Sequence, residues 1–204
     1  MEIQLWRSIL CPYELAVKEL IVKFEHIISE HRENDLYSPI EQVCGRVKSV
    51  SSILEKMQRK HIPMERMEED VEDIAGIRIT CSFFSEIYFV ADMIARQDNL
   101  EVISIKDYIS QPKESGYKSY HMLLSIPVAL GDAKVPTKVE LQIRTMAMDF
   151  WASLEHKIYY KYEGNAPGYF ERELQECSSI ISRLDAKMMT LNEAMKRIEG
   201  DPGL

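Results

Sequence analysis

The sequence predicts an α+β fold in which a mixed β-sheet of about five strands is flanked by helices, with one long helix at the C-terminal end. Residues 77–105 read as strand, helix and strand, and such a βαβ-like passage indicates a mixed sheet with helices packed on it. Residues 170–198 carry apolar side chains at spacings of four and three, which indicates a long helix. At 204 residues, the chain is long enough for one compact unit with a substantial core.

The composition indicates an intracellular enzyme or binding domain. The formal net charge of −8 argues against a protein that coats nucleic acid. The four cysteines are far apart and lack metal-binding spacing, so we expect them to be reduced. Charged residues interrupt the N-terminal region before any apolar run reaches the length of a signal peptide or a membrane span. We therefore expect a soluble, cytoplasmic protein.

Two amphipathic helices are predicted in the N-terminal part. Residues 12–30 carry one apolar stripe, which is typical of a scaffold helix. Residues 47–61 form the second helix, and its inward face is expected to carry Val50, Ile53, Leu54 and Met57. Its other face carries three cations and a hydroxyl in a row: Lys48, Ser52, Lys56 and Arg59. Such a row can hold a polyphosphate through charge-assisted hydrogen bonds, although the pattern also fits a solvated basic face.

A buried strand is predicted at residues 77–83, and the chain is expected to turn tightly just before it. Gly76 allows the backbone to turn there or to approach a ligand closely. Asp73 stands at the mouth of the strand, where it can serve a binding site or simply cap a turn. A third helix around residues 87–94 and a short strand at residues 100–105 complete the βαβ-like passage.

The connection at residues 106–121 is polar and long for a compact domain, so we expect it to be functional. It combines cations that suit a phosphate with aromatic faces that suit a base: Lys106, Lys113, Lys118, Tyr108, Tyr117 and His121. Strands at residues 122–128 and 138–145 follow, separated by a turn at residues 131–136, and they are predicted to be antiparallel neighbours.

The strand at residues 138–145 alternates between apolar and polar side chains. The apolar ones point to one face, and Glu140, Gln142 and Arg144 point to the other. The period alone permits either a strand half exposed to water or a strand that lines a polar cleft.

Two helices end the chain. Apolar positions within residues 147–158 mark the first, and residues 165–168 break it. The second carries an apolar seam formed by Phe170, Leu174, Cys177, Ile181, Leu184, Met188, Leu191, Met195 and Ile198. Such a seam packs against another helix, either in the same chain or in a partner subunit. We favour core packing over a free coiled coil, because Cys and Met are soft fillers.

Taken together, these features describe a site for two nucleotides. The basic helix face suits one polyphosphate, the connection at residues 106–121 suits a second nucleotide, and Asp73 and Glu140 suit a divalent cation. Mg²⁺ usually binds carboxylate and phosphate oxygens and retains waters. The implied chemistry is phosphoryl-type transfer, in which one carboxylate accepts a hydroxyl proton. The sequence has neither a Walker-type loop nor a kinase motif set, which excludes the commonest nucleotide enzymes.

Three motifs resemble those of a known family. DIAGIRI at residues 73–79, GYKSYH at residues 116–121 and VELQIRT at residues 139–145 look like the synthetase motifs of the RelA/SpoT family. The short chain is similar to the small alarmone synthetases of this family, the RelQ and RelP type, from about residue 40 to residue 165. The resemblance implies a nucleotidyltransferase-like synthetase fold. The whole chain, residues 1–204, would form one synthetase domain, with an N-terminal helix and a C-terminal helical extension at about residues 169–199.

The activity that the resemblance implies is that of an ATP:GTP 3′-diphosphotransferase with Mg²⁺ as cofactor. The β,γ-pyrophosphate of ATP would pass to the 3′-hydroxyl of GDP or GTP, giving (p)ppGpp and AMP in the stringent response. The residues that match the ATP site are Arg46 and Arg78 on the adenine and Lys48, Ser52, Lys56 and Arg59 on the phosphates. Asp73 and Glu140 match the catalytic metal ligands, and Glu140 also matches the group that activates the 3′-hydroxyl. The residues that match the GDP or GTP site are Tyr117, which stacks on guanine, and Lys113, Lys118, His121, Gln142 and Arg144.

The resemblance also bears on assembly and regulation. The sequence lacks the His-Asp pair of the family's hydrolase domain, so we expect synthesis only. Small synthetases are typically tetramers with terminal helices at the subunit contacts, which the seam at residues 170–198 fits. Regulation by an alarmone or by single-stranded RNA, and the preference for GDP or GTP, remain open at this point. No membrane partner is expected.

Two other functions compete with this interpretation. Toxic relatives transfer pyrophosphate to the 3′ end of tRNA or to adenosine nucleotides, but a tRNA acceptor requires a basic approach surface, which a net charge of −8 disfavours. A catalytically silent regulator that binds nucleotides or single-stranded RNA would be expected to lose its carboxylates, yet Asp73 and Glu140 are both present. For Gln142 and Arg144, structural support of the loop at Tyr117 is a fair alternative to nucleotide binding.

Overall fold

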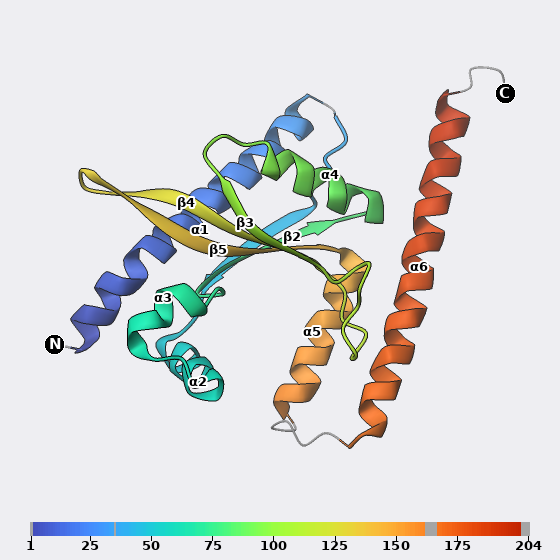
Figure 1. The fold of residues 1–204 in the computed structure, drawn as a ribbon. Coiled ribbons are helices and arrows are strands. Elements are labelled where there is room, and N and C mark those ends of the chain that lie inside the picture. The colour runs from blue at the N-terminus through green and yellow to red at the C-terminus, as the bar shows by residue number, and fades with distance from the viewer. Residues whose placement is uncertain (1, 35, 162–166, 201–204) are drawn as a thin grey trace.

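The structure is a computed structural model that describes residues 2–34, 36–161 and 167–200. The elements are α1 (Glu2–Glu33), β1 (Gln42–Val47), α2 (Val50–Lys60), a short 3₁₀ helix (Met64–Arg66), α3 (Met67–Asp70), β2 (Ala75–Cys81), α4 (Phe84–Ala95), β3 (Glu101–Asp107), β4 (Tyr120–Leu130), β5 (Ala133–Thr145), α5 (Met146–Lys161) and α6 (Tyr169–Gly200). The predicted α+β class, with a mixed five-stranded sheet and a long last helix, is confirmed (Figure 1).

The sheet has the strand order β1-β2-β5-β4-β3, which puts β5 at its centre. β2 and β5 run parallel, and the other neighbouring pairs run antiparallel. The predicted antiparallel pairing of β4 with β5 is therefore confirmed. In this register Glu140 lies between Gly76 on β2 and Leu123 on β4, so its side chain has no long side chain beside it on β2.

The two faces of the sheet have different surroundings. α1 and α4 cover one face, where the apolar side chains of β2 and β5 form the core, with Ile77, Ile79, Leu141 and Ile143 at most 1% exposed. The opposite face carries the polar side chains of the same strands, with α2 near one end and α5 near the other (Figure 1). The alternation along each strand therefore separates the core from the site.

Several element boundaries differ from the predictions. The strand β1 was not predicted, and because Val47 belongs to it, α2 begins only at Val50. The sequence pattern did not reveal β1, because Gly45 has no side chain to continue an alternating pattern. A Cβ atom at Gly45 would lie 2.7 Å from both Ile77 Cδ1 and Val17 Cγ1, so α1 packs closely against the strand there. Leu54 is 45% exposed, and its predicted inward position is wrong.

The other differences concern α1 and the connections. α1 starts ten residues before Pro12, since residues such as Trp6 and Leu10 also pack against the core. The functional connection is shorter than predicted and covers residues 108–119, because both flanking strands extend into it. The turn between β4 and β5 covers only residues 131–132, where Gly131 adopts a φ of +60° that favours glycine. The predicted break at residues 165–168 lies partly outside the described residues.

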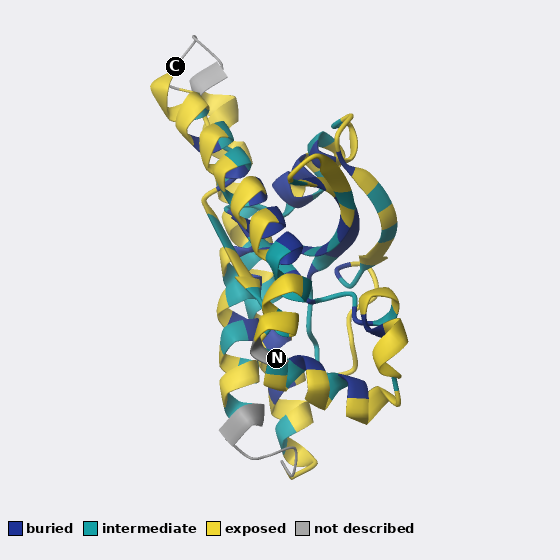
Figure 2. Cartoon of the chain, turned by 90° about the vertical axis from the view of Figure 1, so that its left-hand side faces the viewer, coloured by how far each residue is buried: buried dark blue, intermediate teal, exposed yellow. Residues whose placement is uncertain are grey.

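The long helix α6 runs beside α5 and is packed along only part of its length (Figure 1). Leu174 packs against Trp151, whose indole Nε1 donates to the Leu174 carbonyl at 3.0 Å. Farther along, the seam residues are 50 to 56% exposed: Leu184, Met188, Leu191, Met195 and Ile198. The predicted core packing is therefore wrong for this part of the seam within one chain, because these side chains are exposed, as the outer part of α6 illustrates (Figure 2). Across the described residues, each helix is too short or too polar to cross a membrane.

Candidate active site

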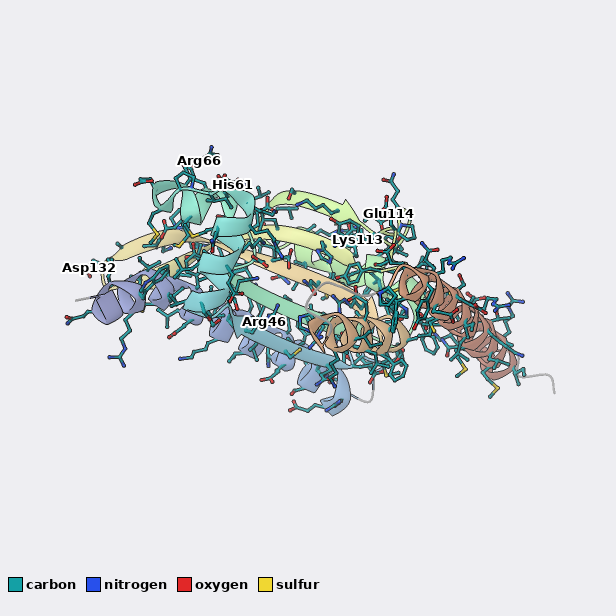
Figure 3. All side chains as sticks on the ribbon, turned by 90° about the horizontal axis from the view of Figure 1, so that it is seen from below. Arg46, His61, Arg66, Lys113, Glu114 and Asp132 are labelled. Carbon is teal, nitrogen blue, oxygen red and sulfur yellow. The ribbon has the colours of Figure 1, made fainter. Side chains whose placement is uncertain are left out.

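A cleft of about 530 Å³ opens between the polar face of the sheet and α5. Seven of the predicted site residues line it: Arg46, Asp73, Arg78, Tyr117, Glu140, Gln142 and Arg144. The alternating strand β5 thus lines a polar cleft and is not simply a strand half exposed to water. Figure 3 views this side of the molecule and shows Arg46 on β1 between α2 and α5.

Asp73, just before β2, lies in a cluster with two lysines. Its Oδ2 accepts a hydrogen bond from Lys48 Nζ at 2.8 Å, and its Oδ1 accepts one from Lys56 Nζ at 2.6 Å. Burial alone would raise the pKa of Asp73, but the two ammonium groups outweigh burial and hold this pKa below its usual range. Because both carboxylate oxygens are bound in this way, the geometry favours a charged cluster over a turn cap.

The cation row is arranged differently from the prediction. Lys48 precedes the helix, because Ser49 is its N-cap and accepts a hydrogen bond from the Ser52 backbone N–H. Lys56 lies on α2, and the two ammonium groups still converge on one carboxylate. Arg59, in the last turn of α2, is exposed. The cations therefore extend from Lys48 and Lys56, which bind Asp73, to Arg59 at the exposed end of α2.

Glu140 is held by neighbours on β4 and β5. Gln142 Nε2 donates to Glu140 Oε2 at 2.7 Å, and His121 Nδ1 lies 3.5 Å from Glu140 Oε1. Burial and the charge of Asp73 raise the pKa of Glu140, but the contacts with His121 and Gln142 outweigh them, and this pKa lies below its usual range. Glu140 is therefore an ionised carboxylate at neutral pH, able to accept a proton or bind a cation.

Tyr117 joins the loop to the floor of the cleft. Its hydroxyl contacts His121 Nε2 at 2.9 Å and accepts a hydrogen bond from Arg144 Nη2, which also donates to Gln142 Oε1 at 2.7 Å. Lys113 Nζ lies 4.7 Å from the centre of the Tyr117 ring. Arg144 thus supports Tyr117 directly, and Gln142 contributes only through Arg144; such support was the alternative that the sequence left open for both.

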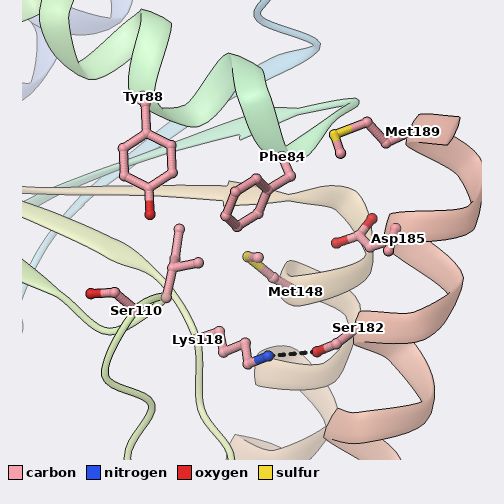
Figure 4. Close-up of a pocket in the computed structure, with 10 residues that line it drawn as sticks. Phe84, Tyr88, Ser110, Lys118, Met148, Ser182, Asp185 and Met189 are labelled. Atoms are coloured by element: carbon pink, nitrogen blue, oxygen red, sulfur yellow. Dashed lines mark hydrogen bonds between the residues drawn. The ribbon is translucent and has the colours of Figure 1, made fainter. Parts of the chain in front are cut away.

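The loop before β4 is anchored to α6. Ser178 Oγ donates to the Gly116 carbonyl at 2.6 Å, and the Gln175 side chain donates to the Glu114 carbonyl. Lys118 points away from the cleft, because its Nζ donates to Ser182 Oγ at 2.8 Å. It lines a second, mostly apolar cavity of about 380 Å³ between α4, α5 and α6 (Figure 4). The structure therefore separates Lys118 from the other predicted acceptor-side residues.

Sequence reasoning missed Asp149 on α5. Its Oδ1 accepts hydrogen bonds from Arg78 Nη1 at 3.0 Å and from Arg144 Nη1 at 3.1 Å. The one signal that could have found it is helical spacing: Asp149, Ser153 and His156 are four and three residues apart, and the latter two line the cleft. From the sequence, this helix was predicted by its apolar stripe alone, and no site residue was assigned to it.

Within the described ranges, no group of three or more His, Cys, Asp or Glu side chains is arranged to hold a metal ion. Asp73 and Glu140 provide two carboxylates on the same cleft. A hard divalent cation could bind there only if a substrate or water supplied further oxygens, which is the usual manner in which Mg²⁺ binds beside phosphates.

Comparisons with known proteins show which family this chain is similar to. A family model described as a region found in RelA/SpoT proteins matches residues 45–165. The GTP pyrophosphokinase YjbM of Bacillus subtilis is 45% identical over 188 residues, which cover 92% of this chain and 89% of that protein. The crystal structure of the small alarmone synthetase 1 from B. subtilis bound to its product pppGpp superposes with a TM-score of 0.91 at 43% identity, covering 94% of this chain and 98% of that one. The same enzyme bound to AMPCPP gives a TM-score of 0.81 at 39% identity, covering 95% and 99%.

The family match covers more than half of the chain, and the similarity to small alarmone synthetases extends over nearly all of it. The motifs at Asp73, Tyr117 and Glu140 lie inside the matched region and line one cleft. This chain belongs to the RelA/SpoT family.

Proposed function

We propose that this protein transfers the β,γ-pyrophosphate of ATP to the 3′-hydroxyl of GDP or GTP, forming (p)ppGpp and AMP. The observation that carries the proposal is a single cleft in which Asp73, bound by two lysines, and Glu140 face the same space. The similarity to an enzyme solved with pppGpp and with AMPCPP supports the same pair of substrates.

The ATP would lie over β1, β2 and α2. Arg46 pairs with Gly76, and Arg78 lies two residues farther along β2, so the two arginines are diagonal neighbours on the polar face. Diagonal positions are about 7–8 Å apart, which leaves room for a flat adenine between two guanidinium planes. The phosphates would bind the residues of the cation row, Lys48, Ser52, Lys56 and Arg59. A bound polyphosphate would compete with the Asp73 carboxylate for hydrogen bonds from Lys48 and Lys56.

We propose Mg²⁺ as the divalent cation, held by Asp73 and Glu140 together with phosphate oxygens. The donor set fits, because both side chains are carboxylates that remain ionised at neutral pH. When bound, the ion would neutralise charge that develops on the transferred pyrophosphate. Lys56 and Lys48 would neutralise charge on the same group from the side of α2.

Glu140 would activate the attacking hydroxyl. The oxygen of the 3′-hydroxyl forms a bond to the β-phosphorus of ATP while its proton passes to Glu140. The bond between the β-phosphorus and the oxygen that links it to the α-phosphorus breaks, and AMP leaves with that oxygen. Gln142 and His121 hold the Glu140 carboxylate in place for this step.

The acceptor nucleotide would bind next to the loop. Tyr117 would stack on guanine. Lys113, His121 and Arg144 contact Tyr117, Gln142 contacts Arg144, and these four residues would line the rest of the acceptor site. Lys113 Nζ lies 4.7 Å from the centres of both the Tyr108 and Tyr117 rings, so a base would displace it from the Tyr117 face. For Lys118 we propose an indirect role, anchoring the loop to α6.

Gly116→Ala is expected to weaken binding of the guanosine nucleotide. Gly116 has a φ of +88°, and an added Cβ would lie 2.8 Å from Ser178 Cβ, so the loop must move away from α6. We expect the KM for GDP to rise about tenfold, because ordering the loop then costs roughly 1–2 kcal/mol more. Steady-state kinetics measure this effect, with Gly131→Ala as a control in the distant β4–β5 turn, where a Cβ has open space. An unchanged KM for GDP would contradict the anchoring role.

The activity itself is tested by product analysis. Purified protein incubated with ATP, Mg²⁺ and either GDP or GTP should release AMP and form a 3′-pyrophosphorylated guanosine nucleotide. Chelation of the metal should stop turnover, and added Mg²⁺ should restore it. Failure to form either product would refute the proposal, and a parallel series with GMP, GDP and GTP would define the acceptor.

The two competing functions receive less support. Relatives that cover most of this chain are named GTP pyrophosphokinases, and the net charge of −8 disfavours a tRNA acceptor. A silent regulator has no need of two carboxylates that face one cleft. Labelled ATP with tRNA as the sole acceptor should therefore give no labelled tRNA.

We further propose that residues 1–204 act as one synthetase domain and assemble into a homotetramer through the terminal helices. The half-exposed seam of α6 supports a subunit contact, because apolar side chains in such a row rarely remain in water. Light scattering on the purified protein tests this assembly. The cytoplasmic location stays a prediction from the composition, and regulation by an alarmone or by single-stranded RNA stays open.

A further inference from the structure

Asp149 connects two strands of the cleft through one carboxylate oxygen. Its Oδ1 accepts hydrogen bonds from Arg78 Nη1 on β2 at 3.0 Å and from Arg144 Nη1 on β5 at 3.1 Å. Asp149 lies in the first turn of α5. That turn is capped by Thr145, whose hydroxyl accepts from the Met148 N–H at 3.1 Å. A negative charge is also favourable at the start of a helix.

Arg144 depends strongly on this carboxylate. The side chain of Arg144 is 6% exposed, and a buried guanidinium requires a nearby opposite charge. Its other hydrogen-bond partners, Tyr117, Ser119 and Gln142, are neutral groups. Asp149 therefore supplies the hydrogen-bonded carboxylate that helps to keep Arg144 in place beneath Tyr117.

Arg78 depends on the Asp149 carboxylate for its orientation. The guanidinium group of Arg78 is tied at two points, with Nε donating to Cys44 Sγ at 3.3 Å and Nη1 donating to Asp149. A thiol is a weak acceptor, so the carboxylate makes the stronger of the two contacts. Together they hold the plane of the guanidinium group at the side of the cleft where Arg46 lies diagonally opposite.

We propose that Asp149 is a positioning residue shared by the two nucleotide subsites: it orients Arg78 for the ATP base and Arg144, with Tyr117, for the guanosine nucleotide. This inference rests on the proposed function for the assignment of the two arginines to different substrates. It predicts that loss of the Asp149 carboxylate, which is not part of the cation row, weakens binding of both nucleotides.

The test replaces Asp149 with asparagine, which keeps the size and removes the charge. Calorimetry would measure the Kd of AMPCPP and, separately, the Kd of GDP. We expect each Kd to rise about 5- to 20-fold, the size of losing one charge-assisted hydrogen bond that orients a binding group. Asp132→Asn is the matched control, because Asp132 is exposed in the turn between β4 and β5, far from the cleft (Figure 3), and both Kd values should match the wild type.

A double-variant cycle distinguishes positioning from a general structural effect. If Asp149 acts on ATP through Arg78, adding Asp149→Asn to Arg78→Gln should raise the Kd of AMPCPP less than twofold further, while the Kd of GDP still rises. Asp149→Glu restores the charge and should recover part of both affinities. Additive losses, or an Asp149→Asn protein with either Kd unchanged, would overturn the inference. Should Asp149→Asn fail to fold, as judged by circular dichroism, Asp149→Ser decides, because it also removes the charge: an unchanged affinity for both nucleotides would overturn the inference.

The two proposals can fail separately. A wild-type protein that binds both nucleotides in an Asp149-dependent way but forms no AMP would refute the proposed function and leave the positioning role standing. A wild-type protein that makes product while the Asp149→Asn variant binds both nucleotides normally would refute only the positioning role.

Discussion

Replacing Glu140 with glutamine is expected to lower the rate of AMP formation about 10³-fold, because positioned general bases contribute roughly 10²- to 10⁴-fold to catalysis. The amide cannot accept the proton of the 3′-hydroxyl, and it is a poorer ligand for a divalent cation. It keeps the shape of the side chain and can still accept the hydrogen bond from Gln142. The fold and the packing around β5 should therefore survive.

The measurement is the rate of AMP release from ATP in the presence of GDP and Mg²⁺. Calorimetry with GDP alone should show a Kd within a few-fold of the wild type, since Tyr117 and Arg144 are untouched. Glu101→Gln, on the exposed start of β3, is a matched control that should keep full activity. A Glu140→Gln protein that retains more than a tenth of the wild-type rate would exclude Glu140 as the base.

Replacing Asp73 with asparagine is expected to reduce both activity and stability. The turnover should fall about 10²- to 10³-fold, because one of two proposed ligands of the divalent cation loses its charge. Stability should fall by about 1–3 kcal/mol at pH 7, because Lys48 and Lys56, whose side chains are 18% and 16% exposed, then lose their shared carboxylate. Urea unfolding and the AMP assay measure the two effects independently.

The stability loss should depend on pH in a defined direction. The pKa of Asp73 is lower in the folded protein than its ordinary value of 3.8, so the carboxylate stabilises the fold above that ordinary value. This contribution disappears as the pH falls through the lowered pKa of the folded state. The difference between wild type and Asp73→Asn should thus be full at pH 7 and shrink below about pH 4. A difference that stays constant down to pH 3 would show that the charge of Asp73 is not the cause.

A control variant at an exposed ion pair shows whether the loss of stability is specific to Asp73 or follows from replacing any aspartate. Asp92 pairs with Arg96 at 2.6 Å on α4, but the two side chains are 56% and 78% exposed. Exposed pairs of this kind contribute about 0–1 kcal/mol, so Asp92→Asn should change stability little and leave AMP formation unchanged.

Local patterns in the sequence were sufficient for most of the fold and for much of the cleft. The alternation at residues 138–145 predicted that Glu140, Gln142 and Arg144 share a face, and they do, because side-chain direction in a strand follows a period of two. The edge strand β1 was not predicted, because Gly45 has no side chain and so interrupts the alternation of apolar and polar residues that indicates a strand. For α6, the apolar spacing of four and three predicted the helix correctly, but it did not predict that the second half of the seam is exposed.

The sequence by itself determined the fold class, the antiparallel β4–β5 pair and the motifs that identify the family, because these depend on neighbours along the chain. Only the tertiary structure decided that Asp149 joins Arg78 to Arg144 and that Lys118 turns away to Ser182 on α6. These contacts join residues up to 71 positions apart, and they depend on how α5 packs on the sheet and how α6 packs against α5. No local period records such packing, because it depends on the whole core.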